Sequence, residues 1–139
     1  MKKIIFFVCL ISFCSTTAMA QVSQATLEKR EKRKNLTIKE WNESAATKTR
    51  FMDRKTVYDA AGRKIEETEY ANYGQKWKIV YEYNALGQCY REVEYDGRNK
   101  VVRIRKYDFY SDGSKKKQYN YLPKGKLETV KEFEYIFNK

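Results

Sequence analysis

The side chains best suited to chemistry are aromatic rings and cations that alternate along short segments of the chain. A tyrosine or tryptophan ring can stack on a sugar, and an arginine or lysine beside it can pair with a phosphate or carboxylate group. This combination predicts a surface that binds an anionic glycan or an envelope protein. The candidate binding residues are Trp77, Tyr81, Arg91, Tyr95, Arg103, Arg105, Lys117, Tyr119 and Lys131.

Paired carboxylates are the second candidate chemistry, because a glycoside hydrolase needs two of them. The glutamates that could supply them are Glu66, Glu67, Glu69, Glu92 and Glu94. Glutamates on solvated strands more often balance lysines, so a hydrolase that uses them is the third and least favoured interpretation. The chain also has no histidine, which excludes Ser-His-Asp and Cys-His nucleophiles and the usual zinc sites. We therefore expect a protein that is not an enzyme and holds no cofactor or metal.

The first twenty residues have the pattern of a secretory signal peptide. Two lysines precede a short apolar stretch, Ile4 to Phe13, and Ala18-Met19-Ala20 is a small-residue cleavage site. The apolar stretch is too short to span a bilayer, so no membrane span is expected. We expect cleavage after Ala20 and a location in the periplasm or outside the cell, where nucleic acid is not the expected partner.

Cleavage would change the charge and cysteine counts. Of the 29 basic residues, 27 would remain with all 18 acidic ones, which gives a net charge of +9 (27 minus 18). One cysteine, Cys89, would remain, so no internal disulfide could form. A lipoprotein lipidated at Cys14 is the alternative to cleavage, and the bulky Phe13 before that cysteine argues against it.

Glycines and tyrosines recur about every twelve residues in the second part of the chain. A segment such as Tyr58-Asp59-Ala60-Ala61-Gly62-Arg63 has Asp at the first turn position and Gly at the fourth. It predicts a type I turn closed by a left-handed residue, a common hairpin connection. Asn99 takes the glycine's place after Tyr95, and after Tyr107 we expect a loop two residues longer that ends at Gly113. The spacing therefore predicts an array of hairpins.

The segments between these turns are rich in Tyr, Val, Ile, Thr and Trp, which favours strands. We expect about seven strands, near residues 50–58, 63–70, 75–83, 88–95, 100–107, 114–121 and 126–135. The predicted fold is all-β, a single antiparallel meander sheet with a short N-terminal helix. Its expected organisation is a signal peptide over 1–20, a basic helix or arm and linker over 21–47, and the β-repeat domain over 48–139. Within the linker, the apolar residues Leu36, Ile38 and Trp41 would suit a short strand or a cover over the sheet.

Three units of the array, YDAAGRKIEETEY, YNALGQCYREVEY and YDGRNKVVRIRKY, resemble the YD repeats of the RHS class. Those repeats are tyrosine-anchored strand–turn–strand units, and the resemblance covers roughly residues 50–135. In that family, long arrays form spiral sheets that enclose a toxin or bind carbohydrate. Six turns are too few for an enclosure, so the resemblance implies the repeat fold alone.

The turns also predict which residues face each other across the sheet. If Asn84 opposes Gln88, Tyr81 opposes Arg91 and Trp77 opposes Tyr95. The same rule at the later turns gives a row across five strands: Tyr81, Arg91, Arg105, Lys117 and Lys131. Like charges opposite each other are destabilising, so such a row would indicate binding. Replacing Arg91 and Arg105 by Thr should then preserve or raise stability. In the alternative, structural interpretation, aromatic ladders hold the sheet together and arginine stems cover the rings.

These observations predict an exported, non-enzymatic protein of the cell envelope that binds an anionic glycan or a protein through an aromatic and basic sheet face. The alternative is a small exported inhibitor or immunity-type protein that docks on a partner enzyme by a sheet face or edge.

Overall fold

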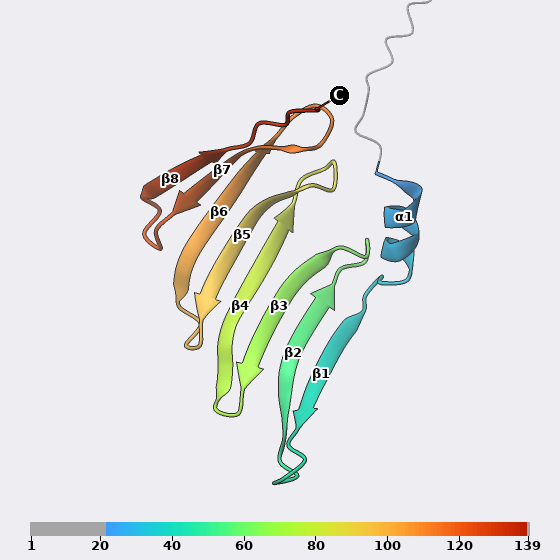
Figure 1. Cartoon of the computed structure of the whole chain (residues 1–139), viewed down its shortest axis with the longest axis vertical. Coiled ribbons are helices and arrows are strands. Elements are labelled where there is room, and N and C mark those ends of the chain that lie inside the picture. The colour runs from blue at the N-terminus through green and yellow to red at the C-terminus, as the bar shows by residue number, and fades with distance from the viewer. Residues whose placement is uncertain (1–21, 139) are drawn as a thin grey trace, which may run out of the picture.

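The structure, a computed structural model, describes residues 22–138, and the expected signal peptide and its cleavage site lie outside them. One short helix precedes eight strands of a single sheet (Figure 1). Their bounds are α1 (Gln24–Glu31), β1 (Thr37–Glu43), β2 (Arg50–Tyr58), β3 (Lys64–Ala71), β4 (Gly74–Tyr83), β5 (Cys89–Asp96), β6 (Val101–Phe109), β7 (Lys115–Tyr121) and β8 (Leu127–Glu132).

The strands follow one another across the sheet in chain order, and every neighbouring pair is antiparallel. This confirms the predicted all-β antiparallel meander. The sheet has eight strands instead of about seven because Thr37–Glu43, the segment around Ile38 and Trp41, pairs with β2. The sheet stays open, and β1 and β8 form its two edges (Figure 1).

The sheet is a single layer, and few side chains are buried in it. Within residues 22–138 the buried side chains are Thr56, Thr68, Val93 and Tyr107. Most domains bury one face of a sheet against a second layer. Here the strands must be held by backbone pairing and by long side chains that cover one another on each face.

Five of the turns have the same backbone geometry. They are Asp59–Arg63, Asn84–Gln88, Asp96–Lys100, Tyr110–Ser114 and Leu122–Lys126. In each turn, the N–H of the first residue donates to the carbonyl of the fifth, and the N–H of the fourth donates to the carbonyl of the first. The fourth residue has a positive φ, 70° at Gly62 and 58° at Asn99, as predicted. The first side chain stabilises three of them: Asp59, Asn84 and Asp96 accept backbone N–H groups two and four residues later. The sequence signal for these turns is therefore confirmed.

A β-bulge follows each of these five turns. The second strand of every hairpin carries one unpaired extra residue close to the turn: Ile65, Tyr90, Val102, Lys116 and Glu128. A bulge places two residues of one strand opposite one of its partner, so all later pairs are displaced by one residue. The longer loop expected after Tyr107 is wrong: the added residues extend β6 to Phe109, and the turn itself has the common form.

Helix α1 is exposed and short, as the polar sequence predicts. The Ser23 hydroxyl caps it by accepting the Thr26 N–H, and no residue of the helix is buried. The helix lies beside the β2–β3 and β4–β5 turns (Figure 1), where the Arg30 guanidinium donates to the Gly87 carbonyl at 3.3 Å. Within residues 22–138, no helix is long and apolar enough to cross a membrane.

Candidate functional site

The predicted basic row is wrong, because the bulges, together with the extension of β6 to Phe109, displace every pair on which it depends. Tyr81 lies opposite Glu92 instead of Arg91, and Trp77 lies opposite Asp96 instead of Tyr95. The observed row is Tyr81, Glu92, Arg105, Asn120 and Thr129. The arginine therefore faces a carboxylate, which is a stabilising cross-strand pair.

The nine candidate binding residues divide between the two faces of the sheet. Residues directly opposite share a face, and neighbours along a strand point to opposite faces. By this rule, the face that we call the Arg105 face carries Trp77, Tyr81, Arg103, Arg105 and Lys131. The other face, the Arg91 face, carries Arg91, Tyr95, Lys117 and Tyr119. The structure does not bring the nine residues together on one surface.

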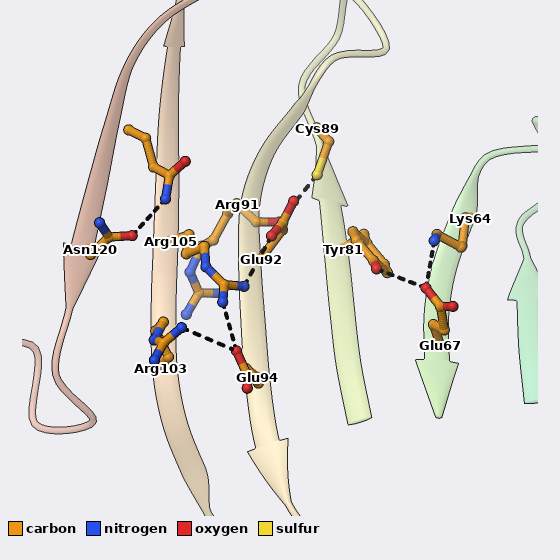
Figure 2. Close-up of polar contacts among 11 residues, drawn as sticks. Lys64, Glu67, Tyr81, Cys89, Arg91, Glu92, Glu94, Arg103, Arg105 and Asn120 are labelled. Carbon is orange, nitrogen blue, oxygen red and sulfur yellow. Dashed lines mark hydrogen bonds and ion pairs between the residues drawn. The ribbon is translucent and has the colours of Figure 1, made fainter. Parts of the chain in front are cut away.

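Arginine and glutamate side chains form an ionic cluster on the Arg105 face (Figure 2). Arg105 donates from Nη2 to Glu94 at 2.8 Å and from Nη1 to Glu92 at 3.3 Å, and its side chain is 19% exposed. Arg103 reaches Glu94 at 4.0 Å and is 52% exposed. The carboxylates thus neutralise Arg105, which makes it a structural cation.

Glu67 forms a second ionic cluster on the same face, at β3 and β4 (Figure 2). Lys64 donates to it at 2.6 Å and the Tyr81 hydroxyl at 3.1 Å, while Arg54 lies 3.5 Å away. Burial acts to raise the pKa of Glu67, but the hydrogen bond and charge of Lys64, together with Tyr81 and Arg54, hold that pKa below its ordinary value. The other four glutamates considered for hydrolysis are also paired with cations: Glu66, Glu69, Glu92 and Glu94.

Three tyrosines and the free thiol lie half-buried or buried on this face. Burial, with a smaller effect from the nearby Cys89 side chain, raises the pKa of Tyr83 to about 12. Burial and glutamate charges also raise the pKa values of Tyr81 and Tyr107. Cys89 has a pKa raised by burial and by Glu92, so its thiol stays protonated and is poorly reactive.

These tyrosines predict a loss of stability in alkali. The unfolded chain ionises its tyrosines near pH 10, whereas the folded protein keeps these protons longer, so their contribution to stability is complete below about pH 10 and falls as the pH rises. For Tyr83 the loss of stability extends up to its pKa in the folded protein, which is about 12. Thermal melts across this pH range measure the loss, and tyrosinate absorbance reports the ionisation. Tyr83→Phe should flatten the profile, because it removes one of the raised pKa values. Titration of all the tyrosines near pH 10 in the folded protein would contradict the prediction.

A recess at the end of the sheet brings aromatic rings and cations together. Its volume is about 500 Å³, and it lies where the β3–β4 and β5–β6 turns meet. Its lining residues are Tyr73, Gln75, Lys76, Trp77, Asp96, Gly97, Arg98 and Lys100. We call it the Trp77 recess. Of the nine candidates from the sequence, it contains Trp77 alone.

Hydrogen bonds fix the backbone of the Trp77 recess. The Asp96 carboxylate accepts from the Lys100 and Arg98 N–H groups at 2.9 and 2.8 Å, and these bonds hold its pKa below the ordinary value. The Gln75 side chain donates to the Asp96 carbonyl at 2.8 Å. Gly97 lies directly against β4, since a Cβ there would come within 2.5 Å of the Gln75 carbonyl oxygen. The turn is therefore held in place while its cationic side chains remain exposed.

Sequence reasoning missed the cations of this recess. Arg98 and Lys100 belong to the turn that follows Tyr95, whose sequence pattern predicts a connection between strands and no binding site. The sequence signal that could have indicated them is that they follow the Asp96-Gly97 pair of a turn in the hairpin next to Trp77. Comparison of the chain with protein-family models and with curated proteins finds no match in either set.

Proposed function

We propose that this is an exported, non-enzymatic binding protein of the cell envelope that binds an anionic glycan in the Trp77 recess. One observation carries the proposal: the rings of Trp77 and Tyr73 line the same 500 Å³ hollow as Arg98 and Lys100. A sugar ring can stack on an aromatic side chain while its acidic group pairs with a cation.

Charge pairing favours the recess over the sheet face. Arg105 and Arg91 each pair with glutamate, so these cations are already neutralised. Arg98 and Lys100 form no ion pair with any residue in the described range 22–138, and both are exposed. They are therefore available to an external anion. The net charge of +9 expected for the cleaved chain supports electrostatic attraction of a polyanion.

One sequence feature supports the same proposal. The signal-peptide pattern that ends at Ala20 supports export, which would place the protein among envelope polysaccharides.

Trp77→Ala is expected to weaken binding of an acidic polysaccharide such as polygalacturonate at least about tenfold, or about 1.4 kcal/mol. The substitution removes the larger stacking ring of the recess. Affinity electrophoresis at several salt concentrations measures the effect, since contacts between exposed charges weaken as ionic strength rises.

Trp41→Ala is the matched control, because Trp41 is the second tryptophan of the chain. It lies on the edge strand β1, is 51% exposed and contacts Arg50. Binding that survives Trp77→Ala, or that both substitutions weaken equally, would place the glycan elsewhere and overturn the proposed function.

The open sheet favours one other function, an inhibitor or immunity-type protein. Strands β1 and β8 are exposed along their whole lengths, so each offers an edge on which a partner could add a strand. Such a protein would form a stable stoichiometric complex that Trp77→Ala leaves intact. That outcome would favour this function over glycan binding.

A further inference from the structure

A second recess lies between helix α1 and the β2–β3 turn. Both elements are at the opposite end of the sheet from the β3–β4 and β5–β6 turns (Figure 1). The volume of this recess is about 280 Å³. Among the described residues that line it, none is acidic. Five are cationic: Lys29, Arg30, Arg33, Arg63 and Lys64. We call it the α1 recess. The rings of Tyr58 and Tyr83 also line it.

Three of the five cations already have partners. Arg63 pairs with Asp59 at 2.8 Å and Lys64 with Glu67 at 2.6 Å. Arg30 donates to a backbone carbonyl, that of Gly87.

Lys29 and Arg33 form no ion pair with any residue that the structure describes. The Arg33 guanidinium lies over the ring of Tyr58, 5.2 Å from its centroid, and so stays at the recess. Two cationic residues therefore line the recess without an ion-pair partner among the described residues, and Arg33 is held there by its contact with Tyr58.

The helix alone does not account for this arrangement. Cations in the last turn of a helix are favoured by its dipole, which explains why Lys29 and Arg30 lie there in α1. It does not supply a full negative charge for Lys29 and Arg33 where this end of α1 packs against the β2–β3 turn, whose own cations Arg63 and Lys64 already pair with Asp59 and Glu67. The close packing depends on Gly62, where a Cβ would overlap the Arg30 carbonyl group. The helix end contributes only about half a negative charge.

We propose that the α1 recess binds a tetrahedral dianion, phosphate or sulfate, either as the free ion or as a monoester on a sugar. Two unpaired cations match two negative charges, and the guanidinium of Arg33 suits the geometry of a tetrahedral oxyanion. A bound dianion would join α1 to the β2–β3 turn and hold the helix against the sheet. The site is separate from the Trp77 recess and does not depend on the proposed glycan.

The test is a titration of the purified protein with inorganic phosphate, followed by amide NMR shifts at constant ionic strength. We expect saturable shifts at the N–H groups of Gly62 and Arg63. The double variant Lys29→Gln with Arg33→Gln should weaken binding at least about tenfold, because it removes both unpaired charges. The control, Lys124→Gln with Lys126→Gln, removes the same charge from the exposed β7–β8 turn and should leave binding unchanged. Trp77→Ala should also leave it unchanged, which separates this site from the glycan site.

Further titrations with sulfate, glucose phosphate and glucose sulfate distinguish the sources of the dianion. Tighter binding of the sugar esters would identify a monoester ligand, and tighter binding of the inorganic ions would identify the free anion. The proposal is overturned if phosphate causes no saturable shifts near Gly62. It is equally overturned if the Lys29 and Arg33 double variant and the Lys124 and Lys126 control weaken phosphate binding to the same extent.

Discussion

Gly62→Ala is expected to lower the free energy of unfolding by about 2–3 kcal/mol, as the sum of two effects. Gly62 has a φ of 70°, in the left-handed region where a side chain causes strain. An alanine Cβ at this position would also overlap the Arg30 carbonyl group, so α1 would have to leave the turn. The hydrogen bond from Arg30 to the Gly87 carbonyl and the Arg33–Tyr58 contact would then be weakened or lost.

Gly125→Ala is the matched control for this prediction. Gly125 occupies the same position in the β7–β8 turn, with a φ of 84°, but a Cβ there would meet no atom within 4 Å. It should therefore show the backbone strain alone, about 1 kcal/mol. Urea denaturation measures both costs, and the rate of tryptic cleavage after Lys29 and Arg30 reports the release of α1. Equal costs and equal cleavage rates in the two variants would show that α1 does not depend on Gly62.

Arg105→Thr is expected to lower the free energy of unfolding by about 1–3 kcal/mol, in contrast to the gain or neutrality that a basic row would give. The arginine is mostly buried and bonds to both Glu92 and Glu94. Its removal leaves two partly buried carboxylates without their main partner, which costs more than the pair contributes while intact. Thermal and chemical denaturation measure the loss.

Two further variants separate charge from packing at this site. Arg103→Thr removes a cation from the same strand and face, but that side chain is 52% exposed and 4.0 Å from Glu94, so the cost should be below about 0.5 kcal/mol. Arg105→Met keeps most of the apolar stem of the side chain and removes the charge. If Arg105→Met restores full stability, the stem matters and the ion pairs do not. If Arg105→Thr is itself neutral, the ionic cluster is not structural.

The turns could be predicted from the sequence because their cause is local. Asp59, Asn84 and Asp96 bond to backbone groups two and four residues later, and Gly or Asn supplies the left-handed residue. Both signals lie within five residues of chain. The strand segments and the meander then follow from the short connections between them.

The register could not be predicted in the same way. The extra residues at the five bulges are an isoleucine, a tyrosine, a valine, a lysine and a glutamate, which share no chemical property. Each bulge lies three residues after the left-handed residue of its turn, so its position follows the turn and not the side-chain type. A displacement of one residue changes every pair along a strand. The residue opposite Arg105 on β5 is therefore Glu92 instead of the predicted Arg91.

The candidate sites show the same division between local and distant causes. Trp77 was identifiable from its ring and its strand. The contact of α1 with Gly62 joins segments about thirty residues apart, and no local pattern in either segment indicates it. Arg98 and Lys100 meet Trp77 only once β4 and β5 are paired in the observed register.

The chain-order arrangement of the strands has a consequence for how the protein folds. Each strand pairs only with the strands before and after it in sequence, so the loops closed at each step are short and their entropic cost is small. Proteins rich in such near-neighbour contacts fold fast, and arrays of this kind can start at any hairpin and grow outward in both directions. The order of assembly is then set by which hairpin is most stable locally, and unfolding should begin at the free edges and move strand by strand toward the centre.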